Sequence, residues 1–422
     1  MACVITPPSE SEVSPSRDLI YSTIDGSSAS LREVNQKRWL TSLEIHNNPE
    51  LCYKEYVSCE TLVLFLSRLG FAVTDGAFGL ETSFIAEFGK EGRLVTFCAE
   101  YDALPDIGHA CGHNLIATAS VAAFLGVAEA LKTSKIAGRV RLLGCPAEEG
   151  GGGKIKLIKA GAFKETDAAM MVHPVQPLPG GKDGVAYGTC LAATAFEANF
   201  LGKASHAGVL PWLGVNALDA ASLAYTAIGL LRQQCRPTDR INVVLDRENR
   251  TGCGVITDKA SLSFGVRCAS LNEVRALEKR VKNCVEGAAL ATGCSFEYTK
   301  EMEAYADLRP NETLCVEFTQ AMRHLGSELI CDLARKDVKG YGTDMGNVSY
   351  ECPSLHAVYN IPAGPGQEAH SIGFAQAAGK DDAFLATLRA AKGLALLGFT
   401  VLENSTVAAQ VWKDFNKDLE KR

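Results

Sequence analysis

Runs of apolar residues alternate with helical patterns in the first half of the chain. Strands are predicted at residues 94–99, 140–144 and 168–172, and helices at 115–131 and 154–160. Residues 31–69 also have helical spacing, interrupted by turn chemistry at Asn47-Asn48-Pro49. Strands that alternate with helices predict an α/β domain with a mostly parallel, doubly wound sheet, which binds ligands beyond the carboxyl ends of its strands.

The middle of the chain has a different order of elements. Strand patterns fall at 192–202, 241–246, 260–268 and 294–305, and helical patterns at 213–231 and 272–291. The order strand, helix, strand, strand, helix, strand is that of a ferredoxin-like α+β unit. We therefore predict a lid domain at 187–306, inserted into a catalytic domain of residues 18–186 and 307–422. The catalytic part resumes with helix, short strands near 355–361 and an Ala-rich helix.

Composition narrows the class of protein. The 422 residues favour two domains, and 47% hydrophobic with 22% charged residues fits a globular chain. The net charge of −7, without a basic block, argues against nucleic acid and weakly favours a cationic substrate. No segment is expected to be a secretory signal or to span a membrane. The 15 scattered cysteines indicate reduced thiols and a cytoplasmic location. Residues 1–17 are predicted to be a disordered tail.

Acidic and imidazole side chains follow the predicted strand ends. Glu100 and Asp102 come after the first strand, Glu148 and Glu149 after the second, and His173 ends the third. Since the carboxyl ends of parallel strands meet at one edge of a sheet, we expect these groups to lie close together. Neighbouring carboxylates after a buried strand need a cation or hydrogen bonds, so one could ligate a metal and the other accept a proton from water. A solvated acidic turn is the alternative.

A second group of candidates lies in loops. Cys111 and His113 flank Gly112, which permits a turn tight enough to direct both side chains at one ion. An ordinary thiol in a turn is the alternative. His370 lies in a Gly/Pro-rich loop, and His206 lies among small residues in the predicted lid, where it could instead cap a helix. The remaining histidines are expected to be structural or surface residues: His46, His109, His324 and His356.

Four motifs occur in order along the chain. They are Glu-Tyr-Asp-Ala-Leu-Pro at 100–105, Gly-His-Ala-Cys-Gly-His-Asn at 108–114, Pro-Ala-Glu-Glu followed by four glycines at 146–153, and Val-His-Pro at 172–174. This series resembles the M20 metallopeptidase and amidohydrolase family, and is similar to its aminoacylase-1-like branch. The resemblance extends from about His46 to His370, which is nearly the whole chain apart from the tail.

The resemblance implies two divalent ions and a lid that also mediates homodimerisation. It implies five metal ligands: Cys111, His113, Glu149, His173 and His370. Thiolate and imidazole ligands favour zinc, while carboxylates admit manganese or cobalt. Glu148 would be the general base, and His206, from the same or a partner subunit, would stabilise the oxyanion. Glu100-Tyr101-Asp102 replaces the His-x-Asp of most M20 peptidases, so Asp102 would orient a ligand, and direct ligation by Glu100 stays open.

We therefore predict a metal-dependent amide hydrolase that acts on small molecules, either dipeptides or N-acyl amino acids, without nucleic-acid or membrane partners. Asp344 is a candidate contact for a substrate amine, as in β-alanyl-lysine-type dipeptides, although a loop aspartate bonded to its own backbone is equally expected. Two other readings remain. One is an amidase with Cys111 as nucleophile and His113 or His109 as base. The other is a catalytically inactive, peptide-binding regulator.

Overall fold

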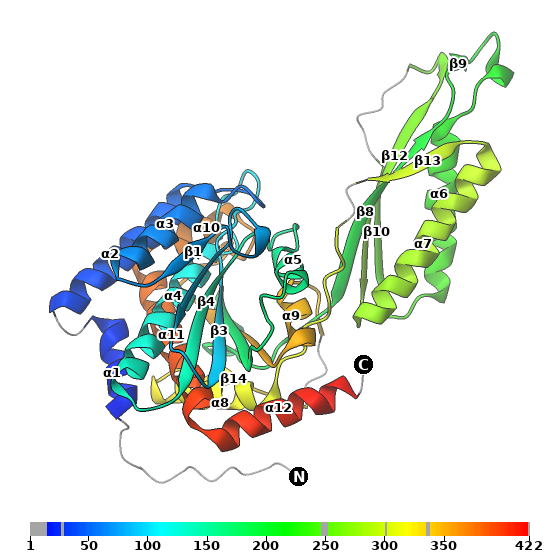
Figure 1. Ribbon diagram of the computed structural model, residues 1–422. Coiled ribbons are helices and arrows are strands. Elements are labelled where there is room, and N and C mark those ends of the chain that lie inside the picture. Colours follow the sequence, from blue (N-terminus) through cyan, green and yellow to red (C-terminus); the bar gives the residue numbers. More distant parts are fainter. Residues whose placement is uncertain (1–14, 27–28, 246–251, 300–301, 335–337, 421–422) are drawn as a thin grey trace.

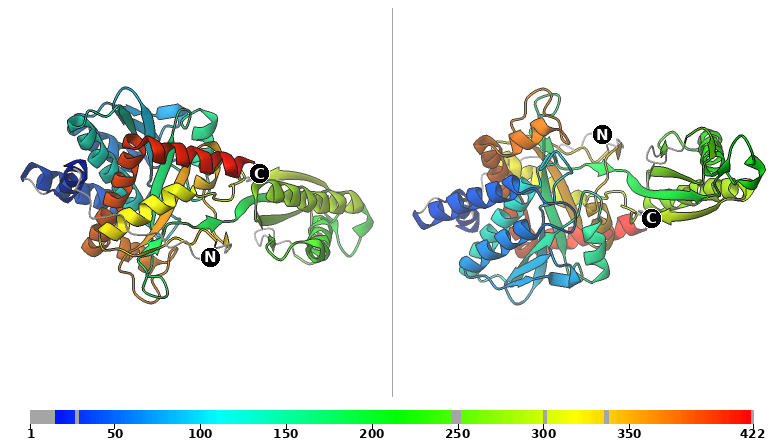
Figure 2. Two further views of the ribbon diagram at one scale, coloured as in Figure 1. Left: turned by 90° about the horizontal axis from the view of Figure 1, so that it is seen from below. Right: turned by 90° about the horizontal axis from the view of Figure 1, so that it is seen from above.

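The computed structural model describes residues 15–26, 29–245, 252–299, 302–334 and 338–420. A broad α/β unit carries a second, elongated unit that projects from it, and the views in Figures 1 and 2 agree on this arrangement. The elongated unit lies within residues 192–299, inside the range predicted for the lid. The α/β unit is formed by the segments before and after it. The chain therefore leaves the larger unit and returns to it.

A mixed sheet of eight strands forms the centre of the α/β unit in the described part of the chain. In spatial order the strands are β1 (Val73–Asp75), β2 (Phe84–Phe88), β4 (Gly138–Cys145), β3 (Arg93–Glu100), β5 (Ala168–Val175), β16 (Ser354–Asn360), β6 (Gly184–Val185) and β14 (Leu329–Ile330). The four central strands, β4, β3, β5 and β16, run parallel. Strands β1, β2 and β6 pair antiparallel with their inner neighbours. The predicted α/β class is confirmed, and the antiparallel strands on either side of the parallel centre are an addition to it.

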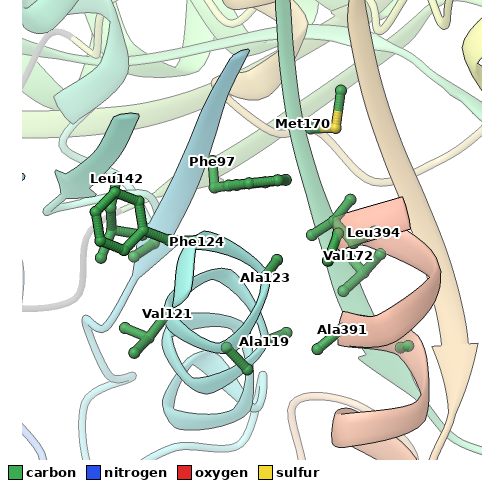
Figure 3. Close-up of a cluster of buried hydrophobic side chains, with 14 of the residues drawn as sticks. Phe97, Ala119, Val121, Ala123, Phe124, Leu142, Met170, Val172, Ala391 and Leu394 are labelled. Carbon is green, nitrogen blue, oxygen red and sulfur yellow. The ribbon is translucent and has the colours of Figure 1, made fainter. Parts of the chain in front are cut away.

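Helices cover both faces of this sheet. The larger layer includes α1 (Pro15–Asp25), α2 (Ala29–Asn47), α3 (Tyr56–Arg68), α4 (His113–Thr133), α8 (Glu312–His324), α10 (Ile372–Ala378), α11 (Asp381–Glu403) and α12 (Ser405–Leu419). The smaller layer on the other face contains α5 (Gly153–Lys159) and α9 (Met345–Glu351). Successive strand side chains point to opposite faces, so Phe97 joins the core under α4 and α11 (Figure 3), whereas Cys98 joins the core under α5 and α9. Burial on both faces explains the continuous apolar runs in the sequence.

Helices α4 and α11 have the length and hydropathy of membrane-spanning helices, contrary to the expectation that no segment would qualify. In the apolar window, 94% of the α4 residues and 67% of the α11 residues are buried within the protein. The two helices pack against each other and against the sheet (Figure 3). Packing in the protein core therefore accounts for their apolar character.

The elongated unit has the predicted ferredoxin-like order. Its strands are β8 (Ala192–Leu201), β10 (Arg240–Leu245), β12 (Lys259–Cys268) and β13 (Ser295–Thr299), and its helices are α6 (Ala217–Leu231) and α7 (Leu271–Thr292). The antiparallel sheet has the spatial order β10-β12-β8-β13, and both helices pack on it. A small pair, β9 (Ser205–His206) with β11 (Val255–Ile256), lies at the far tip in Figure 1. Strands β7 (Thr189–Cys190) and β15 (Val338–Lys339) form a separate parallel pair.

The start of the chain differs in part from the sequence-based expectation. Residues 1–14 of the predicted tail lie outside the described residues, whereas Pro15 to Arg17 begin helix α1. Ile20 and Ile24 of this helix are fully buried in the main core. Proline is well suited to the first turn of a helix, and the apolar spacing that follows gives α1 a face to bury. The proline that suggested disorder therefore starts a packed helix.

Candidate metal centre

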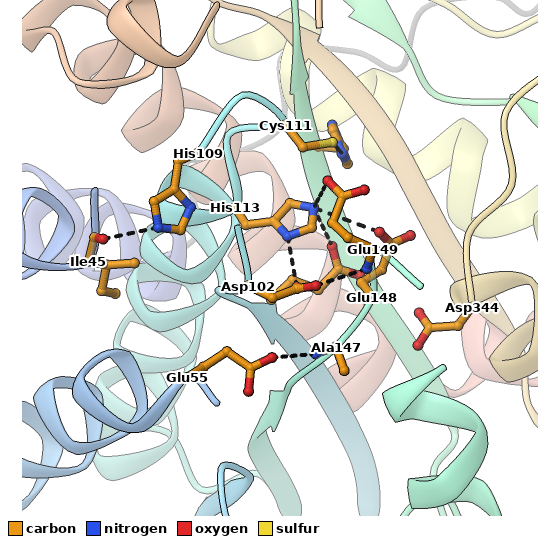
Figure 4. Close-up of polar contacts among 12 residues, drawn as sticks. Ile45, Glu55, Asp102, His109, Cys111, His113, Ala147, Glu148, Glu149 and Asp344 are labelled. Atoms are coloured by element: carbon orange, nitrogen blue, oxygen red, sulfur yellow. Dashed lines mark hydrogen bonds and ion pairs between the residues drawn. The ribbon is translucent and has the colours of Figure 1, made fainter. Parts of the chain in front are cut away.

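The parallel strands end at one edge of the sheet, and the candidate residues lie there (Figure 4). Asp102 follows β3, Glu148 and Glu149 follow β4, and His173 lies near the end of β5. His370 lies in the loop after β16. Its backbone N–H donates to the carbonyl of Ala110 at 2.8 Å. Residues that are up to 268 positions apart in sequence thus share one location because their strands end together.

The turn at residues 111–113 is sterically restricted. Gly112 has a φ of 79°, in the left-handed region that favours glycine, and a Cβ there would lie 2.6 Å from Cγ of Pro174. His113 begins helix α4, and its Nδ1 lies 2.9 Å from Oδ1 of Asp102. Oδ2 of Asp102 accepts from the backbone N–H of Glu149 at 2.8 Å. Asp102 therefore fixes the His113 ring with Nε2 free, and also holds the segment that carries Glu149.

Two sets of potential ligand atoms share the thiol of Cys111. One set is Cys111, His113 and His173, and the other is Cys111, Glu149 and His370, with the atoms of each set within 4.8 Å of one another. Sγ of Cys111 lies 3.3 Å from Nε2 of His173, and Oε1 of Glu149 lies 3.8 Å from Nε2 of His370. All five predicted ligands are thus brought together, and the two sets, which share the Cys111 thiol, could hold two ions.

The unpaired atoms and charges of this cluster fit divalent cations. His113 Nε2 and Glu149 Oε1 are buried and have no hydrogen-bond partner among the described residues. Burial, and next the Glu100 and Glu149 carboxylates, raise the pKa of Glu148 well above its usual range. Burial and Glu149 also raise the pKa of the Cys111 thiol. Burial and neighbouring carboxylates thus disfavour the ionised forms of Glu148 and Cys111, and a bound divalent cation would stabilise those ionised forms.

The Glu148 segment is held by contacts from two distant parts of the chain. Ala147 has a φ of 60°, and its N–H donates to Oε1 of Glu55 at 2.9 Å. The hydroxyl of Tyr305 donates to the Glu148 carbonyl at 2.7 Å and accepts from the Gly152 N–H at 2.8 Å. Burial raises the pKa of Glu55 to about 7. These bonds keep Glu148 directed towards the ligand cluster, with its Oε2 3.9 Å from Nε2 of His113.

A pocket of about 420 Å³ opens over the cluster. Cys111, Glu148, Glu149, His173 and His370 line it, together with apolar and aromatic side chains. This volume falls within the range of small-molecule sites. The pocket therefore presents the candidate ligands and base to a small substrate.

Two pocket residues were missed from the sequence. Arg267, on lid strand β12, has a buried Nη1 without a hydrogen-bond partner in the described part of the chain. His356, expected to be structural or superficial, is buried on β16 with its ring centroid 5.6 Å from that of His173. His356 pairs in register with Met171, two residues before His173. Only that cross-strand register, which the local sequence does not encode, would have indicated His356.

The sequence pattern of Peptidase family M20/M25/M40 matches residues 96–386. The chain belongs to this family. A Xaa-Arg dipeptidase of Mus musculus is 38% identical over 401 residues, which cover 92% of this chain and 91% of the relative. An aminobenzoyl-glutamate utilization protein from Klebsiella pneumoniae has the same fold, with a TM-score of 0.71 and 21% identity over 90% of this chain and 99% of that one. A Bacillus subtilis M20 peptidase described as dinuclear metal-binding has a TM-score of 0.65 and 21% sequence identity. The match covers 88% of this chain and 99% of that one. The chain is accordingly a hydrolase of the peptidase class.

Asp344 does not lie where the predicted contact with a substrate amine requires it. Its side chain is fully buried, and its Oδ1 lies 2.6 Å from Nζ of Lys154. Its Oδ2 accepts from the backbone N–H of Lys154 at 2.9 Å. Asp344 is therefore paired inside the protein and does not line the pocket. The prediction of an amine contact was wrong because the burial of a loop residue is set by packing between distant segments.

His206 does not reach the pocket of its own chain. It is exposed at the far tip of the lid, in strand β9 (Figure 1). Its Nδ1 accepts from the N–H of Gly208 at 3.1 Å. In the neutral ring this leaves the proton on Nε2, which can donate to an external group. Within one chain, then, His206 is separated from the other M20 candidate residues.

The arrangement does not favour Cys111 as the nucleophile. A nucleophilic cysteine needs a lowered thiol pKa, whereas burial and Glu149 raise that of Cys111. Of the two bases considered, His109 is turned away, with its Nε2 3.0 Å from the carbonyl oxygen of Ile45. His113 is bonded to Asp102. The thiol instead lies where both ligand sets meet.

Proposed function

We propose that this M20 protein is a dinuclear, metal-dependent dipeptidase that cleaves dipeptides ending in a basic residue. The observation that carries the proposal is the pair of ligand sets sharing Cys111 beneath a pocket that also contains Glu148. The dipeptide class is supported by the 38% identity to a Xaa-Arg dipeptidase. Zinc suits the thiolate and imidazoles best, with manganese or cobalt as alternatives. The cytoplasmic location stays a prediction.

In this proposal, separate residues bind the ions and transfer the proton. Cys111, His113 and His173 would hold one ion, and Cys111, Glu149 and His370 the other. When bound, the ions polarise the amide carbonyl and acidify water. A Glu148 carboxylate oxygen accepts one proton from the attacking water as the new C–O bond forms. Glu148 then returns that proton to the leaving nitrogen as the C–N bond breaks, so the products are a carboxylic acid and an amine.

The dependence on metal is the first test. We expect purified protein to hydrolyse Xaa-Arg and Xaa-Lys dipeptides, including β-alanyl-lysine, faster than N-acyl amino acids. Dialysis against a chelator should abolish hydrolysis, and zinc, manganese or cobalt should restore it, as followed by the release of the free amino acid. Activity that resists chelation but is lost with iodoacetamide would instead support a cysteine nucleophile. Purified protein without bound ions or hydrolysis would support a regulator.

Arg267 is proposed to bind the substrate's C-terminal carboxylate. A guanidinium with an unpaired buried nitrogen at a pocket wall matches the geometry of a carboxylate. We expect Arg267→Gln to raise KM about 10- to 100-fold, since hydrogen bonds to charged groups contribute about 1.5–3 kcal/mol. The matched control is a dipeptide with an amidated C-terminus. An equal effect on both substrates, measured by steady-state kinetics, would contradict this role.

We also propose a homodimer formed through the lid. Large hydrophobic side chains are exposed on the lid. The exposed fractions of Trp212, Tyr225 and Leu230 are 73%, 50% and 72%. Strand β10 is an unpaired edge of the described lid sheet and exposes Val244. Apolar surface concentrated on one projecting unit is typical of an interface. The partner subunit's His206 would then donate its Nε2 proton to the oxyanion.

A further inference from the structure

A buried ion triad lies beneath the ligand cluster, and the proposed mechanism does not use it. Lys154, Glu100 and Asp344 are each fully buried. Nζ of Lys154 contacts Oε1 of Glu100 and lies 2.6 Å from Oδ1 of Asp344. Lysine is almost never fully buried unless it is paired, and breaking a buried pair leaves an uncompensated charge. The single ammonium of Lys154 is therefore shared by two carboxylates.

The local fold explains why a lysine reaches this position. Lys154 is the second residue of α5, directly after Gly153. A Cβ on Gly153 would lie only 1.7 Å from the carbonyl oxygen of Pro146, so the start of α5 packs tightly under the segment that leads to Glu148. The Lys154 N–H also donates to Oδ2 of Asp344 at 2.9 Å. The backbone and ammonium of one residue thus hold the same carboxylate.

Glu100 could otherwise compete for a metal. Its Oε2 is buried without a hydrogen-bond partner in the described part of the chain and lies 3.6 Å from Nε2 of His113. Glu100, His113 and Glu148 form a third set of ligand atoms within 4.8 Å of one another. His113 Nε2 has one lone pair and can serve one ion only. An ion bound to the carboxylates of Glu100 and Glu148 would occupy the proposed base, Glu148, and would compete for His113 with the ion at Cys111.

We propose that Lys154 is a built-in counter-cation, whose ammonium pairs with Glu100 and so keeps a third metal ion from binding to Glu100, His113 and Glu148. Its ammonium offsets the negative charge of Glu100 and repels another cation from that carboxylate. The two catalytic ions are thereby restricted to the sets that share Cys111, and Glu148 is left unligated. This inference rests on the proposed dinuclear function. Lys154 acts through Glu100, so it is a positioning residue.

Counting bound ions tests this role directly. The variant Lys154→Met/Asp344→Asn removes one positive and one negative charge, which leaves Glu100 without its cation. We expect it to bind about one more Mn²⁺ per chain than the wild type, because carboxylates suit manganese. Free Mn²⁺ is measured by its electron paramagnetic resonance signal after equilibrium dialysis. Adding Glu100→Gln to this variant should return the number to that of the wild type.

A second variant keeps the test decisive if the first does not fold. Glu100→Gln alone preserves shape, and it should leave the number of bound Mn²⁺ ions unchanged because Glu100 is not a ligand. Loss of an ion in Glu100→Gln, or an unchanged number in folded Lys154→Met/Asp344→Asn, would overturn the inference. An extra ion in the latter variant, with none in the wild type, would support the Lys154 role while refuting the dinuclear site.

Discussion

Replacing Glu148 by glutamine should lower kcat by about 10²- to 10⁴-fold, the usual contribution of a positioned general base. Glutamine has nearly the same shape, but its amide cannot accept the proton of the attacking water. Glu148 belongs to neither ligand set that shares Cys111, so bound metal should stay at the wild-type level. Steady-state kinetics together with metal analysis of the same sample would measure both effects.

Glu149→Gln is the matched control for this prediction. Glu149 is adjacent in sequence and belongs to the set with Cys111 and His370, so its replacement should lower metal content as well as activity. The two variants would then differ in metal content. A general loss of stability would not produce that difference between neighbouring residues. If Glu148→Gln lost an ion and Glu149→Gln kept both, the roles assigned to the pair would be reversed.

The second large effect is expected at His206. His206→Ala should lower kcat by about 10²- to 10³-fold, as for the loss of one oxyanion donor. Because His206 is exposed at the lid tip and outside its own pocket, the fold and metal content should not change. Thermal unfolding and metal analysis would establish that the protein is intact before kinetics are compared.

Mixing subunits would show where His206 acts. If it serves the partner's pocket, a dimer of one His206→Ala and one Glu148→Gln subunit contains one complete site. Random exchange should restore about one quarter of wild-type activity, since half of the dimers are hybrids with one working site of two. The control pairs His206→Ala with the double variant His206→Ala/Glu148→Gln, which cannot form a complete site. No recovery in verified hybrid dimers would rule out action across the interface.

Much of the α/β unit and lid could be predicted because their elements have strong local periodicity. The predicted strand at 94–99 corresponds to β3, and the helix at 272–291 to α7. Short strands such as β1 and β6 were missed, since three or two residues carry little periodic signal. The first three residues of α1, 15–17, were taken as part of the tail because proline and serine are frequent in that stretch of sequence.

The sequence alone determined which chemical groups follow the strands, and that was enough to predict a metal-dependent hydrolase. Parallel strands place their carboxyl ends together, so Glu149 and His173 could be assigned to one site before any coordinates. Only the tertiary structure decided that both ligand sets meet at Cys111, that Asp344 is paired with Lys154, and that the pocket includes Arg267 from the lid. The physical reason is that the order of strands and helices along the chain is encoded by local pattern. Contacts between side chains far apart in the chain depend instead on register, burial and charge pairing across packed elements.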